Sequence, residues 1–400
     1  MDARAGFMYN IILMIVQTEQ QLVDICHRLR GVPAIFLDTE FVSEGRYYPD
    51  LGSIQLAAGN VEALIDPLAI RDLSPLFSLL LDPNTLKVFH APMQDAAILY
   101  RKIGHPVAPV FDTQVAAALL GIDEQISFAN LVQHCTGVRL SKAHSFTDWL
   151  RRPLSPGQVE YALDDVRYLI PVYEQMVREL DKEQRIEWAT EEFQQRFEDE
   201  TRLAPADPRE LYLKLRGIDR MPMKALTLLR ELVAWREEIA RARNLPVGRV
   251  ARDEVLIELA RRPRTSLIEL REVRALQPQQ IEQFGKDLLQ VLARGPVDDC
   301  PVVKHSSSLP PSLEPTVDFL CLCLRSLAGV HAVSPGMVAT RSDLAALIQA
   351  GEQADVPLMR GWRREVIGED LLATLQGRAT ARIIPGSRQV HLDWNEPATE

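Results

Sequence analysis

The strongest constraint on the fold is a short apolar segment that ends in two acidic residues, Ala34 to Phe41. Its start, Ala-Ile-Phe-Leu, is typical of a strand buried on both faces of a mixed sheet. Asp38 and Glu40 follow with Thr39 between them, and because strand side chains alternate, both carboxylates point to the same side. Two carboxylates held so close repel each other unless a proton or a cation lies between them. A divalent metal ion would relieve the repulsion, since Mg²⁺ and Mn²⁺ prefer oxygen ligands; alternatively, the pair begins a solvated loop.

Length and composition limit the kind of protein. A chain of 400 residues can form two or three domains. Hydrophobic residues make up 46% and charged residues 25%, which is ordinary for a globular protein, and no apolar run is long enough to span a membrane. The five cysteines are scattered and odd in number, which indicates reduced structural thiols. We therefore expect a cytoplasmic protein, and a monomer.

The charge is unevenly distributed along the chain. The formal net charge is −10, yet residues 201–295 carry 19 Lys and Arg against 13 Asp and Glu, a local balance of +6. A basic middle region beside an acidic remainder suggests a phosphate-binding module attached to a second domain. The alternative is a helical surface that is merely rich in arginine.

Apolar periodicity predicts the elements of the N-terminal half. Strands are expected near residues 7–16, 34–41, 53–58, 62–65, 87–90 and 110–112. Helices are expected near residues 18–30, 73–81, 94–103, 113–120 and 127–135, and a longer helix follows Ser155-Pro156. Strands that come first and then mix with helices predict an α/β sandwich with a mixed sheet.

Three further residues extend the acidic pattern. Asp95 falls in the first turn of the helix expected at 94–103, directly after a short strand. Tyr161 and Asp165 are four residues apart on a later predicted helix, so they share one face. Taken singly, Asp95 could be an acid that favours the helix dipole, and Tyr161 a core aromatic. Their joint occurrence after an acid-Thr-acid strand end favours a shared site.

These residues resemble the three motifs of the DEDD 3′→5′ exonucleases of the tyrosine subclass, in particular the ribonuclease D family. The motifs are Asp38-Thr39-Glu40, His90 through Asp95, and Tyr161-x-x-x-Asp165. Segments outside the motifs match as well, at residues 36–42, 47–56, 64–68 and 147–154. The resemblance spans residues 14 to 295, and the sequence drifts from it in the expected substrate loop, between Lys142 and Phe146.

The resemblance implies a ribonuclease H-like exonuclease domain with a mixed sheet and two divalent metal ions, Mg²⁺ or Mn²⁺. Asp38, Glu40 and Asp165 would hold one ion, while Asp38 and, through water, Asp95 would hold the second. Tyr161 would orient the attacking water. Two ions about 4 Å apart can both activate water and stabilise the leaving oxygen of a phosphodiester.

Contacts with the substrate are less sharply indicated. Gln55, His90 and Trp149 are candidates for binding the terminal nucleotide, and each is equally plausible as a structural residue. Tyr47 and Tyr48 could stack on bases, or they could lie on the sheet.

Four segments follow from the resemblance and from the linkers. Residues 1–203 form the exonuclease domain, 209–295 a helicase-and-RNase-D C-terminal (HRDC) helical domain, 313–378 a second, degenerate HRDC-like domain, and 379–400 a tail. The HRDC domain is expected to hold the nucleic-acid backbone, or only to pack against the first domain. The candidate contacts are Lys214, Arg216, Arg236, Arg241, Arg243 and Arg249.

The resemblance therefore implies a metal-dependent 3′→5′ exoribonuclease that releases nucleoside 5′-monophosphates from RNA 3′ ends. Precursors of tRNA, or other structured RNA, are the expected substrates. A DNA exonuclease is an alternative, because a metal site that contacts phosphate ignores the sugar unless a pocket recognises the 2′-OH. A non-catalytic RNA-binding scaffold is a second alternative, against which the five intact motif positions argue.

Overall fold

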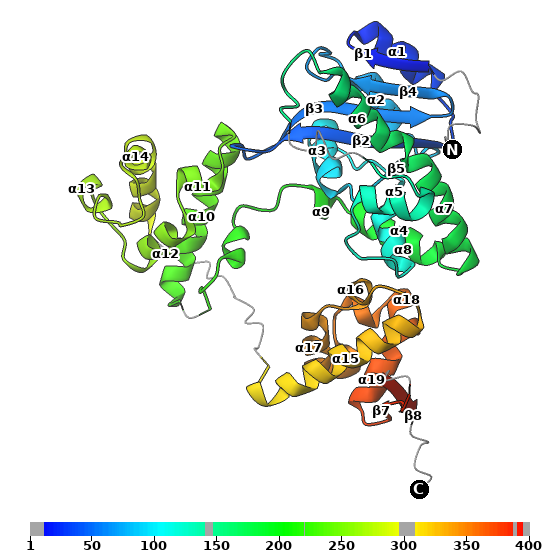
Figure 1. The fold of residues 1–400 in the computed structure, drawn as a ribbon. Coiled ribbons are helices and arrows are strands. Elements are labelled where there is room, and N and C mark those ends of the chain that lie inside the picture. The colour runs from blue at the N-terminus through cyan, green and yellow to red at the C-terminus, as the bar shows by residue number, and fades with distance from the viewer. Residues whose placement is uncertain (1–11, 141–146, 220, 296–308, 387–389, 395–400) are drawn as a thin grey trace.

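The computed structural model describes residues 12–140, 147–219, 221–295, 309–386 and 390–394. Figure 1 shows three units along the chain: an α/β N-terminal unit (12–203), a helical middle unit (209–295) and a C-terminal unit (309–394). Within the described ranges, every helix is too short or too polar to cross a membrane.

A six-stranded mixed sheet forms the centre of the N-terminal unit, as the sequence predicts. Its strands are β1 (Ile12–Val16), β2 (Ala34–Val42), β3 (Asp50–Ala58), β4 (Val61–Ile65), β5 (Leu86–Phe89) and β6 (Val110–Asp112), in the order β1-β4-β3-β2-β5-β6. β2, β3 and β4 form an antiparallel meander, to which β1, β5 and β6 add parallel pairs. β3 begins earlier than expected because pairing of β2 with β3 continues past a bulge after Glu40. Residues 7–11 of the expected first strand lie outside the described residues.

Nine helices in the described part of this unit connect and cover the strands. They are α1 (Glu19–Arg28), α2 (Ser74–Leu80), α3 (Met93–Ile103), α4 (Thr113–Leu119), α5 (Phe128–Thr136), α6 (Pro156–Arg167), α7 (Leu169–Lys182), α8 (Ile186–Phe197) and α9 (Glu200–Leu203). Thr18 caps α1 in a capping box with Gln21, which confirms the predicted helix start. α6 packs against β2, β3 and β4, so whatever its inner face carries lies over the strand that ends in Asp38 and Glu40.

The middle unit is all helical and has a hydrophobic core of its own. It comprises η1 (Leu211–Lys214), α10 (Met223–Arg243), α11 (Val247–Val250), α12 (Asp253–Arg261), α13 (Leu267–Leu270) and α14 (Pro278–Arg294). Leu229, Leu256 and Leu288, on three different helices, are at most 1% exposed in this core. The unit can therefore bury its apolar residues without help from the sheet.

The C-terminal unit is helical with a terminal hairpin. Its elements are η2 (Pro311–Leu313), α15 (Glu314–Val330), α16 (Pro335–Val338), α17 (Arg341–Ala350), η3 (Gly351–Gln353), η4 (Pro357–Met359), α18 (Gly361–Arg363), η5 (Arg364–Gly368), α19 (Glu369–Leu375), β7 (Ala379–Ile383) and β8 (Val390–Trp394). β7 and β8 pair antiparallel in the segment expected to be a tail, and Leu392 is buried. Part of the expected tail is thus ordered, because the hairpin adds apolar side chains to the core beside it.

A buried ion pair joins the C-terminal unit to α8. Glu192 is 2% exposed, and its carboxylate accepts hydrogen bonds from Arg363 Nη2 at 2.8 Å and from Trp362 Nε1 at 3.1 Å. Trp362 stacks on Trp188 of α8, with ring centroids 4.8 Å apart and planes 12° apart. A buried carboxylate is tolerated only where donors surround it, so these contacts fix the C-terminal unit on this face.

Backbone contacts extend the same interface to the end of α4. Arg185 Nη1 donates to the carbonyl oxygens of Leu119 at 2.6 Å and Ala332 at 2.7 Å. Gly121 has φ +69°, and a Cβ there would lie 2.7 Å from the carbonyl of Ala332, so only glycine allows this approach. The buried apolar residues of the N- and C-terminal units form one continuous core, from which the core of the middle unit is separate.

The middle unit is held by the loop between β2 and β3, which Figure 1 shows reaching from the sheet to α10. The Tyr47 hydroxyl donates to the Glu237 carboxylate and accepts a hydrogen bond from Arg241 Nε at 3.1 Å. The backbone N–H of Tyr48 donates to Asn244 Oδ1 at 2.7 Å, and Asn244 ends α10 in the left-handed conformation, with φ 49°. Tyr47 therefore neither lies on the sheet nor offers a free ring; it docks the middle unit.

We expect Arg363→Met to destabilise the shared core by about 3–5 kcal/mol, because the buried Glu192 would lose its nearer cation and keep only Arg196, at 3.6 Å. Urea unfolding followed by tryptophan fluorescence, with the Trp188–Trp362 pair as reporter, measures the change. Arg364→Met is the matched control, since Arg364 forms exposed ion pairs with Glu352 and Glu369 and should shift the urea midpoint little. Equal midpoints for the two variants would contradict a stabilising role for the buried pair.

Candidate metal centre

The end of β2 delivers two carboxylates to one place. Asp38 pairs with Gln55 and Glu40 with Ser53 in the antiparallel register with β3, and the bulge follows Glu40. The apolar residues before them, Ile35 to Leu37, are at most 7% exposed and anchor the strand in the core. Because the strand is fixed up to its acidic end, the two side chains have little freedom to move apart.

α6 adds a third carboxylate from above the sheet. The helix begins at Ser155, whose side chain forms a capping box with Gln158, and Pro156 occupies the first turn, as the sequence predicts. Tyr161 and Asp165 lie one turn apart on this helix, which packs on β2, β3 and β4. Asp38, Glu40 and Asp165 each place one carboxylate oxygen within 4.8 Å of the others, and all three are half-buried. The three predicted ligands therefore meet at a place that solvent can reach.

Asp95 approaches from the turn between β5 and α3. Ala91 adopts a left-handed φ of 52° in this turn, and its N–H donates to Asp112 Oδ1 at 2.9 Å. α3 then places Asp95 in its first turn, where the carboxylate accepts a hydrogen bond from the Thr39 hydroxyl. Asp95 is not part of the close group of three oxygens. Its charge nevertheless acts on Asp38 and Glu40 and raises their pKa values, and the water-mediated metal contact expected of it stays a prediction.

Burial raises the pKa values of all four acids, and repulsion by neighbouring carboxylates adds to the effect for Asp38, Glu40 and Asp165. Burial raises the pKa of Glu40 to about 8, with the charges of Asp165 and Asp95 adding to the effect. Burial, and then the charge of Asp164, raises the pKa of Asp165 to about 7. The pKa of Asp38 is raised well above its ordinary value by burial and then by Asp165, Asp95 and Glu40. The pKa of Asp95 is raised by burial, against which the Thr39 hydrogen bond acts.

The donor set fits a hard divalent cation. Among the described residues, no arginine or lysine forms an ion pair with Asp38, Glu40, Asp95 or Asp165, although the buried acids Glu62 and Asp66 each have such a partner. Asp66, for example, binds the Arg152 guanidinium at 2.7 Å. Carboxylate oxygens without a protein cation are the ligands of Mg²⁺ or Mn²⁺, because either ion supplies the missing positive charge.

A buried framework supports the tyrosine face of the site. Trp149 lies 6.1 Å from Tyr161, ring centre to ring centre, and packs on Gly52 of β3. A Cβ on Gly52 would lie 2.7 Å from the Trp149 carbonyl, so the strand and this segment can approach only at a glycine. Arg152 fastens the segment by donating to Asp66 and to the Gly52 carbonyl, the latter at 2.6 Å.

The structure does not favour Gln55, Trp149 and His90 as residues that bind the nucleotide. Gln55 is 0% and Trp149 2% exposed, so neither side chain can reach a bound nucleotide. Both ring nitrogens of His90 are engaged, Nδ1 with Thr113 Oγ1 at 2.9 Å and Nε2 with the Ile126 carbonyl at 3.1 Å. Burial lowers the pKa of His90 to about 4, so the ring is neutral at pH 7. The structural alternative applies to these three residues.

The predicted backbone contacts of the middle unit divide into two groups. Arg236 is 5% exposed and donates to Asp253 at 2.6 Å, so its assignment as a nucleic-acid contact is corrected. Arg241 is occupied by Tyr47, Glu237 and the Ala206 carbonyl. The exposed residues are Lys214, Arg216, Arg243 and Arg249, of which Arg243 lies over the ring of Phe284. The latter four remain available to phosphate.

Two supporting residues were not expected from the sequence. Thr39 was assigned no role, since alternation turns it away from its two acidic neighbours, yet it contacts Asp95. Asp112 holds the left-handed turn before Asp95 and has no motif of its own. No pattern in one sequence signals either contact, because each joins strands or turns far apart along the chain. The drifting substrate loop at 142–146 lies outside the described residues.

Comparison with known proteins agrees with this arrangement. The model of a 3′-5′ exonuclease family matches residues 13–181, and that of the HRDC domain matches residues 225–292; the second HRDC-like domain expected at 313–378 is not confirmed. The chain is 36% identical to ribonuclease D of Nitrobacter hamburgensis over 383 residues, 93% of this chain and 97% of that protein. It is 37% identical to ribonuclease D of Granulibacter bethesdensis over 369 residues, 91% of this chain and 92% of that protein.

A solved structure is similar along almost the whole length. The crystal structure of Escherichia coli RNase D, described as an exoribonuclease involved in structured RNA processing, matches with a TM-score of 0.82 and 32% sequence identity. The match covers 92% of this chain and 99% of that one. Both the fold and the order of the three units are therefore shared.

We expect the metal-free protein to lose stability as the pH rises from about 5 to about 8. Because the pKa values of Glu40 and Asp165 are raised on folding, the native state binds more protons than the unfolded state over this range. Added Mg²⁺ at pH 8 should restore stability, since the ion replaces those protons. Thermal unfolding in EDTA and in Mg²⁺ measures both effects, with Asp165→Asn expected to show a shallower pH dependence. If the stability of Asp165→Asn depended on pH in the same way as that of the unmodified protein, the raised pKa assigned to Asp165 would be contradicted.

Proposed function

Because the chain belongs to the ribonuclease D family and is a 3′-5′ exoribonuclease, we propose that it trims the 3′ ends of structured RNA, tRNA precursors among them. The observation that carries the proposal is the meeting of Asp38, Glu40 and Asp165 within 4.8 Å in a chain so similar to ribonuclease D. Members of this exonuclease family use divalent metal ions, and we propose Mg²⁺ or Mn²⁺ here. The products would be nucleoside 5′-monophosphates.

The side chains divide the work of hydrolysis. Asp38, Glu40 and Asp165 would hold one ion, and Asp38 with Asp95, through water, a second. Bound there, the ions would acidify the attacking water and stabilise the leaving 3′-oxygen. Tyr161, one turn before Asp165, would orient that water for in-line attack. Thr39 keeps Asp95 turned toward the centre by its hydrogen bond.

The exposed cations of the middle unit would hold the RNA upstream of the cut end. Lys214, Arg216, Arg243 and Arg249 are exposed on a unit with its own core, which is tied to the sheet beside the metal centre through Tyr47. Such contacts bind phosphates without reading sequence. We propose that the protein acts as a monomer in the cytoplasm, where its cysteines stay reduced.

The direct test uses RNA with a stable hairpin and a single-stranded 3′ tail, labelled at the 5′ end. In Mg²⁺ or Mn²⁺ we expect a ladder that shortens by single nucleotides from the 3′ end, release of 5′-monophosphates, and no reaction in excess EDTA. DNA of the same sequence should react more slowly. A tRNA precursor with a 3′ trailer tests the substrate; trimming that ignores the tRNA body would contradict the tRNA proposal.

Asp165→Asn should abolish hydrolysis, with a loss of at least about 100-fold in kcat/KM, because one ligand charge is removed. The protein should stay folded, since removing one of several repelling acids relieves the apo site. Asp164→Asn is the matched control. Asp164 directly precedes Asp165, but its Oδ1 lies 3.2 Å from Arg167 Nη1, so this variant should keep nearly full activity. Equal loss in both variants would count against the metal assignment.

Lys214→Ala and Arg216→Ala should each weaken RNA binding and lower the slope of log K against log salt by about 0.7. The reason is that each exposed cation releases counterions from one phosphate. Binding of the labelled RNA in EDTA at several salt concentrations measures the slope. Lys182→Ala serves as control, because Lys182 is also exposed but lies on α7 of the N-terminal unit. Slopes that match the control would place the RNA elsewhere.

A further inference from the structure

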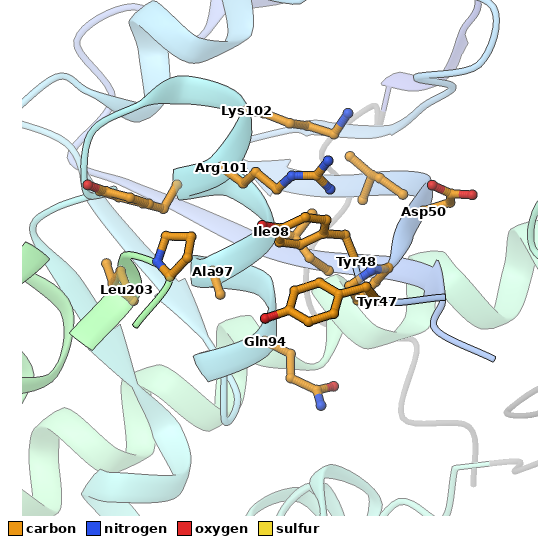
Figure 2. A pocket seen from close by; sticks show the side chains of 13 residues that line it. Tyr47, Tyr48, Asp50, Gln94, Ala97, Ile98, Arg101, Lys102 and Leu203 are labelled. Carbon is orange, nitrogen blue, oxygen red and sulfur yellow. The ribbon is translucent and has the colours of Figure 1, made fainter. Parts of the chain in front are cut away.

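We propose that a cavity of about 510 Å³ beside α3 is an RNA subsite that holds one nucleotide of the substrate strand upstream of the bond to be cut. The proposal rests on the exoribonuclease function and adds a binding position to it. The cavity lies between α3, the end of the loop between β2 and β3, and the chain after α9 (Figure 2). Its size is within the range of about 300–1,000 Å³ that is typical of ligand pockets.

The walls of the cavity come partly from the elements that carry the metal centre. Gln94 lines it and directly precedes Asp95, while Leu51 lines it and pairs with Phe41, the residue after Glu40. Arg101 lines the far part and follows Asp95 by six residues, about 9 Å along the helix. A stacked strand rises about 3.4 Å per nucleotide, so that distance corresponds to about two or three nucleotides. A strand whose 3′ end lies at the acids can therefore reach the cavity.

A stacked guanidinium gives the cavity its recognition chemistry. Arg101 Cζ lies 3.6 Å from the centre of the Tyr48 ring, and Figure 2 shows the guanidinium extended from α3 over that ring. Tyr47 meets Tyr48 edge to face, with ring centroids 4.6 Å apart. Stacking fixes the plane of the guanidinium while its N–H groups remain free to donate to phosphate. Since the Tyr48 N–H is bound to Asn244, the backbone that carries the ring is also held in place.

Two positive charges at the cavity have no acidic partner among the described residues. Arg101 and Lys102 are both exposed, and in the described part of the chain neither forms an ion pair or a hydrogen bond. The acid on the same wall, Asp50, is already bound to Arg46 at 2.6 Å. Cations in the last turn favour the helix dipole of α3, which accounts for their residue type but not for the stacking on Tyr48. A phosphate is the ligand that would satisfy both.

The remaining walls suit a base. Ala97 and Ile98 of α3, together with Leu203 at the end of α9 and Pro205 after it, supply apolar surface opposite the tyrosine rings. Apolar walls can bind any base, because each base has an apolar face. The cavity thus offers one cationic side and one apolar side, which match the anionic phosphate and the base of a single nucleotide. Because the apolar walls would contact a base through its face, the subsite is expected to be tolerant of sequence.

The test compares a long and a short RNA substrate. For a five-nucleotide RNA, Arg101→Ala should raise KM about tenfold with little change in kcat, because the strand loses a phosphate contact upstream of the cut. For a dinucleotide, which cannot reach the cavity, the variant should match the unmodified enzyme within about twofold. Lys102→Ala should act in the same direction. Arg30→Ala is the matched control, since Arg30 is exposed and lines a cavity of similar volume, about 480 Å³, between α1 and α2.

Other outcomes separate the possible errors. Equal losses on both substrates would show that Arg101 acts through α3 and Asp95, and no loss on either would show that the cavity is empty during catalysis; both overturn the subsite. If the unmodified protein hydrolyses no RNA, the proposed function fails, and the subsite is judged by binding alone. Titration of the fluorescent five-nucleotide RNA in EDTA should then still give weaker binding for Arg101→Ala, with a salt slope lower by about 0.7. Unchanged binding in that titration overturns the subsite.

Discussion

The repulsion among carboxylates at the end of β2 is the constraint on which the site depends. Asp38, Glu40 and Asp165 are held within 4.8 Å by a buried strand and a capped helix, and no described cation of the protein neutralises them. The fold therefore carries a local cost that either protons or a divalent ion must relieve. The packing of the rest of the sheet offsets this unfavourable free energy, since its buried residues fix β2 up to Asp38.

Much of this arrangement follows from local patterns in the sequence. Alternation of Asp38 and Glu40, the four-residue spacing of Tyr161 and Asp165, and the Ser155 start of α6 are each properties of a single element, and a short window of sequence carries them. The mixed sheet and its helices follow in the same way. The predicted nucleotide contacts could not be judged without the surrounding structure. Trp149 and Gln55 have residue types suited to a nucleotide, but the packing that buries them comes from other elements.

Contacts between units were equally hidden from the sequence. From the sequence alone, Arg236 is a plausible phosphate ligand. Only the position of Asp253 shows that Arg236 forms an ion pair within the middle unit. Tyr47 and Tyr48 were ambiguous because a tyrosine on a loop can face base, sheet or partner helix. The structure gives them adjacent tasks, since Tyr47 docks α10 while Tyr48 carries the Arg101 guanidinium. One loop thereby links the metal centre, the cavity beside α3 and the middle unit.

The continuous core shared by the two ends of the chain has a consequence for how the molecule comes apart and how it is made. The N-terminal unit is synthesised first, yet part of its finished surface, around Trp188 and Glu192 of α8, is completed only by Trp362, which follows the middle unit in the chain. Until then the Glu192 carboxylate and the Trp188 indole face water, while the middle unit can already bury its own apolar residues. Heating should accordingly melt the protein in two cooperative blocks, one of them built from segments far apart in the sequence.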